Sequence, residues 1–325
     1  MRDINEQKQV EHNMQIQKGR AEALLEAVPD PVVIVDHEGR IAIVNARTEE
    51  VFGYSREELL GQPIEQLIPK RLQATHTAHR TQYQKDPHTR SMGTGLDLIA
   101  CRKDGSEFAV DVSLSPLATP EGTLIISIIR DVTKEKQAEA QIYNLAFYDA
   151  LTQLPNRRLF NDRLGQTMAS SKRTRRYGAL MFLDLDNFKP VNDKHGHAAG
   201  DLLLIEVANR LKECVREVDT AARFGGDEFV VMLDELNVDK AESASQARII
   251  AEKIRTDLSD PYLLTIKHEA GADTTIEHCC TVSIGVVVFI NDDGSQDDVL
   301  KWADAAMYKA KESGGNQIYF SDANT

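Results

Sequence analysis

The sequence has few cysteines, no long hydrophobic run and a shortage of basic residues. Its thiols are Cys101, Cys214, Cys279 and Cys280. They show no C-x-x-C spacing, so the pattern favours neither a zinc site nor a disulfide framework and indicates buried or inert thiols in a reducing compartment. The most apolar runs, 124–129 and 282–290, are far shorter than a membrane-spanning helix and are typical of buried strands. The N-terminal residues are charged and lack the apolar core of a signal peptide. We therefore expect a cytoplasmic chain with no membrane segment. If the parent protein is anchored in a membrane, we expect the anchor to lie outside this stretch.

Charge and length set further limits. The 325 residues carry 38 Lys and Arg against 51 Asp and Glu, a net charge of −13. A chain this acidic lacks the basic field that attracts nucleic-acid polymers and anionic membranes, so we expect neither as a partner. A phosphate ligand would have to be held locally, by a metal, by lysines or by backbone amides. The length favours two domains of ordinary size.

A repeated segment defines the domain layout. Residues 2–11 resemble residues 130–139, and each copy has the pattern of a strand end that runs into a polar helix. The second copy follows an apolar strand, whereas the first follows nothing. We therefore expect that 1–19 is the helical tail of an upstream domain and that the chain is a fragment of a longer protein. The remaining predicted segments are 20–133, 134–148 and 149–325.

Between the two copies, short apolar runs alternate with turn signals. VVIVD and IAIVN flank the turn at 37–40, a second hairpin surrounds 103–106, and a last strand covers 123–130. This pattern predicts five antiparallel strands with helices on one side. LLEAVPDPVVIVDHEGRIAIVNARTEEVFGYSREELLGQPI, with the later RKDGSEFAVDVSLSPL and RDVT, resembles a PAS domain. The resemblance implies a sensory or dimerising domain over 20–133 and leaves its ligand unknown.

Three residues of this domain raise the question of a haem. His76, His79 and Tyr83 lie on a predicted helix, and the His-x6-Tyr spacing loosely resembles haem-binding PAS proteins, which makes His76 a candidate haem ligand. Histidines on a polar helix such as 71–85 are usually solvated, and the pattern shows no apolar haem pocket. We therefore favour solvated histidines over haem. Flavin is less favoured still, because the reactive-cysteine signature of light-sensing relatives is absent.

The stretch 133–147 connects the two halves. It is rich in Lys, Glu, Gln and Ala, contains neither Gly nor Pro, and carries Ile142, Leu145 and Ala146 towards its end. This predicts a helix. Its apolar residues favour pairing with a second copy as a short coiled coil, so we expect a homodimer through the PAS domain and this helix.

From 149 onwards, helices and strands alternate around one predicted sheet, as in an α+β or α/β domain. The apolar strand 179–183 ends in DLDNFK at 184–189, two carboxylates and a lysine that suit a hard cation such as Mg²⁺. RFGGDEF at 223–229 predicts a tight hairpin whose glycines permit a positive φ and close approach of a phosphate. Successive strand residues point to opposite faces, so we do not expect Asp227 and Glu228 to act equally at a metal.

These segments occur in a specific order along the chain. With Asn192-Asp193, GHAAGD at 196–201 and ADAAMYKAK at 303–311, they match the order of the GGDEF family, and 149–320 looks like a diguanylate cyclase. The resemblance implies a nucleotidyl-cyclase-like domain with a central, mainly antiparallel sheet. It also implies condensation of two GTP molecules into cyclic di-GMP with release of two pyrophosphates, by a dimer in which each domain holds one GTP.

The resemblance assigns roles to individual residues. Asp184 and Asp227 would bind Mg²⁺ or Mn²⁺ through carboxylates and Leu185 through its carbonyl, with Glu228 assisting. The remaining substrate contacts would come from Lys189 and Lys311 at the phosphates, Asn192 and Asp201 at the guanine, and Gly225 and Gly226 in the turn. Lysines and metal would neutralise phosphate charge, and an amide and a carboxylate suit the guanine edge.

Two further features concern regulation and rate. Arg216-Glu217-Val218-Asp219 matches the R-x-x-D product-inhibition site of the family, with Arg216 and Asp219 as its contacts and Arg255 as a weaker partner. Relatives commonly have arginine in A-K-x-x-G-R-N where this chain has Gly315, which removes a phosphate contact. Two alternatives therefore stay open: a catalytically weak domain that binds GTP or cyclic di-GMP, and a regulatory piece of a larger GGDEF-EAL phosphodiesterase.

Overall fold

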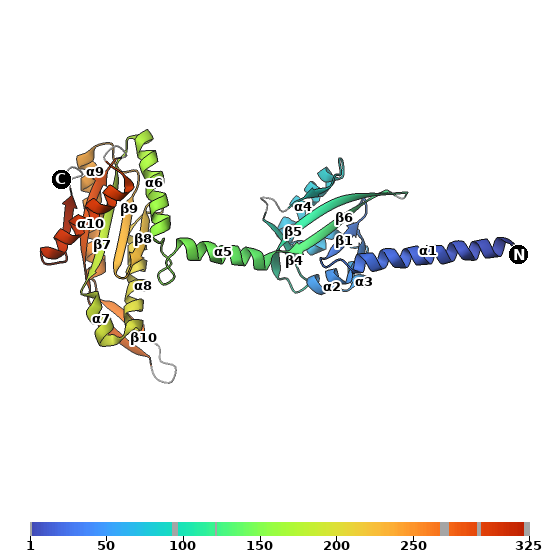
Figure 1. Ribbon diagram of the computed structural model, residues 1–325, viewed down its shortest axis with the longest axis horizontal. Coiled ribbons are helices and arrows are strands. Elements are labelled where there is room, and N and C mark those ends of the chain that lie inside the picture. The colour runs from blue at the N-terminus through green and yellow to red at the C-terminus, as the bar shows by residue number, and fades with distance from the viewer. Residues whose placement is uncertain (1, 93–96, 121, 267–272, 291–293, 322–325) are drawn as a thin grey trace. The chain divides into compact units, whose positions relative to one another are not determined.

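The structure is a computed structural model that describes residues 2–92, 97–120, 122–266, 273–290 and 294–321. The chain forms two compact units, Met1–Ala140 and Gln141–Thr325, each described here by itself (Figure 1). Helix α1 (Arg2–Glu26) begins the first unit, and the division falls within α5 (Thr133–Phe147). The structure has a helix with the bounds that we predicted from the composition of 133–147.

The N-terminal unit contains an antiparallel sheet in the order β2-β1-β6-β5-β3, with β4 also paired to β5. Its strands are β1 (Val32–Val35), β2 (Ile41–Val44), β3 (Arg90–Ser91), β4 (Leu98–Cys101), β5 (Glu107–Thr119) and β6 (Gly122–Asp131). The predicted antiparallel PAS architecture is therefore confirmed. The short strand β3 is a sixth strand that the sequence did not predict. It has two residues, which show no apolar pattern.

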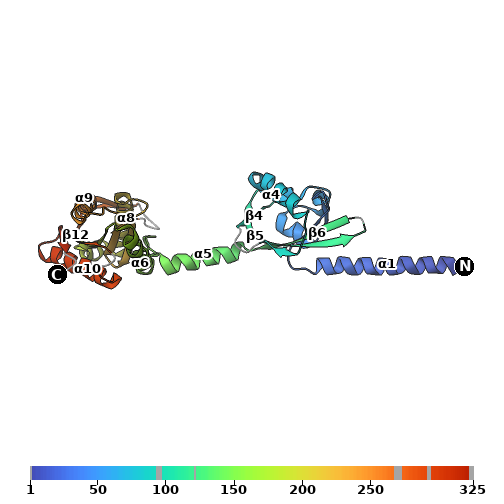
Figure 2. The ribbon, with the colours of Figure 1, turned by 90° about the horizontal axis from the view of Figure 1, so that it is seen from above.

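Short helices cover one side of this sheet, as Figure 2 shows. They are α2 (Ala46–Phe52), α3 (Arg56–Leu59), the 3₁₀ helix η1 (Ile64–Leu67) and α4 (Lys70–Tyr83). Helix α3 begins with a capping box in which Ser55 and Glu58 each bond the other's backbone N–H, so its start is fixed locally. The core between helices and sheet includes Val33, Phe52 and Phe108.

The C-terminal unit is built on the sheet β13-β12-β7-β9-β8. Its strands are β7 (Gly178–Asp186), β8 (Thr220–Gly225), β9 (Glu228–Leu233), β12 (Thr281–Phe289) and β13 (Ile318–Ser321), and a separate hairpin joins β10 (Tyr262–Ile266) to β11 (Thr274–His278). Of the strand pairs described in this sheet, β12–β13 is parallel and the others are antiparallel. The predicted, mainly antiparallel sheet is confirmed.

Helices cover both faces of this sheet, which explains why β7 reads as a continuous apolar run. Helices α8 (His197–Cys214) and α9 (Lys240–Ser259) pack on one face, and α6 (Arg157–Thr174) and α10 (Gln296–Glu312) pack on the other (Figure 2). The short helix α7 (Phe188–His195) lies between β7 and α8 in sequence. Among the described residues, no helix combines the length and apolar character that a membrane span requires.

Candidate active site

The end of β7 and the start of β9 bring two acidic residues together. Asp184 is directly opposite Glu228 in the antiparallel pair, and opposed residues share one face of a sheet. Asp184 is 8% exposed, so its carboxylate lies largely away from water. This pairing places Glu228, which we expected only to assist, beside a predicted metal ligand.

The turn between β8 and β9 carries Asp227 to the same place. The register shifts between Arg223 and Gly225, and Gly225 and Gly226 have φ of 148° and 53°. A Cβ on either glycine would meet nothing within 4 Å, so the space in front of the turn is open. The negative charge of Asp227 raises the pKa of both Asp184 and Glu228, so Asp227 lies within electrostatic range of the two carboxyls.

A half-buried arginine holds this turn in place. Arg223 donates from Nε and Nη2 to the Gly226 carbonyl, at 3.1 and 2.8 Å, and from Nη1 to Asp149 Oδ1 at 2.9 Å. Asp149 also accepts from the hydroxyl and backbone N–H of Thr152. We predicted no role at the site for Arg223 or Asp149. Their contact joins residues 74 positions apart, so no local pattern reveals it.

One lysine completes the acidic cluster. Lys311 Nζ, at the end of α10, lies 2.6 Å from Asp184 Oδ1. Burial raises the pKa of Asp184, and Asp227 and Glu228 raise it further while Lys311 opposes them. Burial likewise raises the pKa of Glu228, with the charges of Asp304 and Asp227 adding to the effect. The cluster therefore concentrates negative charge that one lysine only partly offsets.

This arrangement fits a divalent metal. Asp184 Oδ1 is buried, and apart from its ion pair with Lys311 it accepts no hydrogen bond of good geometry. Within the described ranges, no three His, Cys, Asp or Glu side chains converge closely enough to bind a metal alone. Mg²⁺ suits such a site because it takes one or two carboxylates and completes its shell with water and substrate phosphates. Asp184, Asp227 and the Leu185 carbonyl are the groups that would hold it.

The other predicted substrate residues lie on α7 and α8. Lys189 is exposed in the first turn of α7, and Asn192 lies further along the same helix. A Cβ on Gly200 would lie 2.1 Å from Asn192 Oδ1, so the glycine makes room for this amide. Asp201 follows Gly200 on α8 and is exposed. Asn192 and Asp201 thus lie near one another at the α7–α8 contact, whereas no contact joins Lys189 to the acidic cluster among the interactions described.

Asp186 is the second carboxylate of the 184–189 segment that we expected to suit a cation, and in the structure its carboxylate is instead taken up by hydrogen bonds to protein groups. Its carboxylate accepts from Thr281 Oγ1 and Ser283 Oγ, both at 2.7 Å, and from the Asn316 backbone N–H at 2.8 Å. These groups lie on β12 and on the loop after α10. Asp186 therefore fixes the loop that directly follows Lys311.

Gly315 lies in that loop with a φ of 73°. A Cβ at this position would lie 3.1 Å from Asp186 Oδ2. Positive φ is strained for other residues, so glycine suits this local backbone. The missing arginine thus coincides with a backbone that favours glycine.

The predicted inhibitory residues do not gather at one place. Arg216 and Asp219 line a hollow of about 230 Å³ together with Arg163 and Lys212. Asp219 accepts from the backbone N–H groups of Arg216 and Asp234, at 2.9 and 3.2 Å, so it also shapes this loop. Arg255 does not line the hollow.

Arg255 instead belongs to the surroundings of the loop after α10. It donates from Nη1 to Asn316 Oδ1 at 3.0 Å and from Nε to Glu252. The structure therefore connects Arg255 to the Asp186 loop.

The interpretation of the PAS histidines as solvated agrees with the exposed His79 but only in part with the half-buried His76. Its Nδ1 lies 3.1 Å from Glu65 Oε1, burial lowers its pKa, and it lines an apolar cavity together with His79. The helical pattern around it is polar because α4 turns its other side to water. The sequence could not show that the sheet covers the side of α4 that carries His76.

The cysteines are also less uniform than expected. Cys214 and Cys280 are buried, but Cys279 is exposed and Cys101 is half-buried. All four are free thiols, as their spacing indicated.

Comparison with known proteins identifies both units. A family model described as "Diguanylate cyclase, GGDEF domain" matches residues 146–317, and a PAS-fold model matches residues 19–132. The first match takes in more than half of the 325 residues, so the chain belongs to the diguanylate cyclase GGDEF family, with a PAS domain ahead of it.

Individual relatives agree with this assignment. The probable diguanylate cyclase DgcE of Escherichia coli is 31% identical over 320 residues, which cover 97% of this chain and 27% of that protein. The bifunctional diguanylate cyclase/cyclic di-GMP phosphodiesterase MucR of Pseudomonas aeruginosa is 37% identical over 230 residues, 68% of this chain and 31% of MucR. The chain thus spans less than a third of either relative.

A solved structure matches the C-terminal half. The coiled coil and GGDEF domain of DgcB from Caulobacter crescentus, in complex with c-di-GMP, is 29% identical with a TM-score of 0.50. The match covers 58% of this chain and 93% of that one.

Proposed function

We propose that the chain is a diguanylate cyclase that condenses two GTP molecules into cyclic di-GMP and two pyrophosphates in the cytoplasm, under the control of its PAS domain. The observation that carries the proposal is the meeting of Asp184, Asp227 and Glu228 with Lys311, beside an open glycine turn. A cluster of carboxylates beside open space suits a metal-bound triphosphate, since phosphoryl transfer depends mainly on positioning and charge neutralisation.

Each bond-forming step has the same balance. The 3′ oxygen of one GTP bonds to the α-phosphorus of the other, the bond from that phosphorus to pyrophosphate breaks, and the hydroxyl proton is released. Mg²⁺ or Mn²⁺, when bound by Asp184 and Asp227, supplies charge neutralisation at the phosphates. Lys311 is placed to contact the phosphates, and Asn192 with Asp201 to select guanine. Glu228 is opposite Asp184 in the strand pair, which makes it the candidate to accept the hydroxyl proton.

The direct test is to incubate the purified chain with GTP and Mg²⁺ and to separate the nucleotides by chromatography. We expect cyclic di-GMP and pyrophosphate in a ratio of one to two. Asp184→Asn and Glu228→Gln should reduce the rate by about a hundredfold or more, as loss of a group that acts in the transition state does. Asp162→Asn is the matched control, because Asp162 lies exposed on α6, away from the acidic cluster in sequence, and accepts from Gln166. Absence of product at every protein concentration would contradict the proposal.

One GTP per domain requires two chains, and α5 offers a contact for them. Ile142, Tyr143 and Leu145 are 66%, 52% and 68% exposed, unusual for apolar side chains on a helix. We propose that these residues pair with a second copy. Sedimentation should show a dimer that Leu145→Glu weakens, with a steeper dependence of the rate on protein concentration. A monomeric chain with undiminished turnover would reject this part of the proposal.

A second candidate function follows from Gly315. A GGDEF domain that lacks the arginine could bind GTP or cyclic di-GMP without turning GTP over. Equilibrium binding of GTP with no product would favour this function over catalysis. Gly315→Arg then tests whether the missing arginine causes the lack of turnover. A gain of turnover in this variant would identify the missing phosphate contact as the cause, although the positive φ costs about 1 kcal/mol for a residue other than glycine.

Product inhibition is the regulatory part of the proposal. Arg216 is exposed beside the hollow of about 230 Å³ and can offer its guanidinium to a guanine or a phosphate. Cyclic di-GMP should inhibit turnover, and Arg216→Ala should shift the inhibition curve to higher concentration. Arg173→Ala, at the exposed end of α6, is the control. An inhibition curve that Arg216→Ala leaves in place would reject this assignment.

A further inference from the structure

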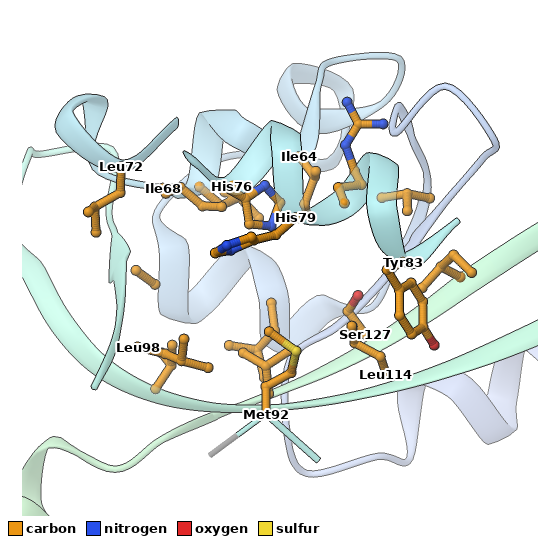
Figure 3. A pocket seen from close by; sticks show the side chains of 18 of the residues that line it. Ile64, Ile68, Leu72, His76, His79, Tyr83, Met92, Leu98, Leu114 and Ser127 are labelled. Carbon is orange, nitrogen blue, oxygen red and sulfur yellow. The ribbon is translucent and has the colours of Figure 1, made fainter. Parts of the chain in front are cut away.

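The PAS domain encloses a cavity of about 300 Å³ between α4, η1 and the inner face of its sheet. Figure 3 shows His76 and His79 projecting from α4 towards the strands that carry Leu98 and Leu114. Most of the lining is aliphatic, and its contributors include Val35, Ile64, Leu67, Ile68, Leu72 and Ile125. A cavity of this size with a mainly apolar wall is typical of a site for a small organic molecule.

The charged groups at the cavity are paired, with one exception. Arg80 donates from Nε to Glu65 Oε1 at 3.0 Å and from Nη1 to the Glu38 carbonyl at 2.7 Å. Asp97 forms an ion pair with Lys136. Arg90 makes no ion pair with any carboxylate in the described part of the chain, and its Nε is buried without a hydrogen-bond partner.

The pairing of β3 with β5 places Arg90 on the face of the sheet that lines the cavity. Arg90 of β3 is opposite Leu114 of β5, and opposed residues of an antiparallel pair share one face. Leu114 and Arg90 both line the cavity. The guanidinium lies over the ring of Tyr83, 4.6 Å from its centroid, which holds it in place without neutralising it.

The histidines do not change this balance of charge. His76 Nδ1 lies 3.1 Å from Glu65 Oε1 and can donate to it, so Glu65 faces both His76 and Arg80. Burial lowers the pKa of His76, in agreement with a neutral ring. His76 and His79 are also too few to hold a metal ion, and no third ligand joins them among the described residues.

We propose that this cavity binds a small organic monocarboxylate with an apolar body, whose carboxylate pairs with Arg90 and whose hydrocarbon part lies among the aliphatic residues. A buried donor without a partner is costly, and an arginine–carboxylate pair is charge-assisted and can be bidentate. One unpaired cation in an apolar cavity therefore selects a ligand with one negative charge. The proposal is independent of the cyclase activity, since it concerns binding alone.

The test compares octanoate with octanol on the full-length chain by titration calorimetry. The two probes share an apolar body and differ in charge, so we expect octanoate to bind about tenfold or more tightly. Arg90→Gln should remove that preference while octanol binding stays unchanged. Arg47→Gln is the matched control, because Arg47 is an exposed arginine of the same domain that pairs with Glu50.

Several results would overturn the proposal. Equal affinity for octanoate and octanol in the unaltered chain would do so without any variant. So would absence of octanoate binding at millimolar concentration, or a preference that survives Arg90→Gln. A Soret band in the purified protein, lost with His76→Ala, would replace the monocarboxylate by a haem.

Discussion

Replacing Asp186 by alanine should destabilise the C-terminal unit and slow turnover, although Asp186 is not expected to touch substrate. Its carboxylate joins three parts of the unit: β7, the β12 residues Thr281 and Ser283, and the Asn316 backbone. Lys311 lies five residues before Asn316, so loss of the carboxylate frees the chain that positions it.

The magnitude follows from what remains after the substitution. A hydrogen bond to a charged group contributes about 1.5–3 kcal/mol. Ser283 is fully buried, so its hydroxyl would lose its partner with no water to replace it. Thr281 and Asn316 are half-buried, and water can partly satisfy them. We therefore expect a loss of about 3–5 kcal/mol for Asp186→Ala, and about 1–2 kcal/mol for Asp186→Asn, which keeps an acceptor oxygen.

The assay uses the single tryptophan of the chain. Trp302 lies on α10 and packs against the core of the C-terminal unit, so its fluorescence reports unfolding of this unit alone. For a domain of this size the midpoint should fall by about 10 °C. Asp162→Ala is the control, and rates should be compared well below the transition. An Asp186→Ala variant with the midpoint and turnover of the unaltered protein would refute the reasoning.

Two further predictions concern packing and reactivity. A Cβ on Gly285 would lie 2.1 Å from the Ala303 carbonyl oxygen and from the Met307 nitrogen. Because both are backbone atoms, Gly285→Ala should push α10 away from β12 and reduce the free energy of unfolding by about 3 kcal/mol. The unfolding midpoint measured by tryptophan fluorescence should fall accordingly. An unchanged transition would show that α10 moves freely on the sheet. Iodoacetamide at pH 8 should modify exposed Cys279 long before Cys280, whose pKa burial raises to about 12, as peptide mass spectrometry can measure. Equal modification of the two thiols would contradict the described burial.

The elements that the sequence predicted best are those with local causes. The helix 133–147 has strong helix formers throughout and no breaker, and α5 has these bounds. The hairpin around Gly225 and Gly226 follows from residues that permit positive φ. The order of the motifs defined the family, and the family models agree.

The PAS histidines show where local reasoning fails. The residues around His76 are polar, and a polar helix suggests solvent on all sides. His76 is nevertheless half-buried, because Glu65 of η1 and the sheet lie on the side of α4 that carries it. Burial of a side chain depends on which face of its helix another element covers, and no spacing within α4 specifies this.

The sequence by itself determined which chemical groups this protein has and the local backbone that presents each of them. Only the tertiary structure decided which groups meet: Asp184 with Glu228 and Lys311, Arg223 with Asp149, and Asp186 with partners 95, 97 and 130 positions away. The physical reason is that turns, caps and helix propensity depend on neighbours within a few residues. Pairing across a sheet depends on the register of whole strands, which the packing of both helical layers fixes together.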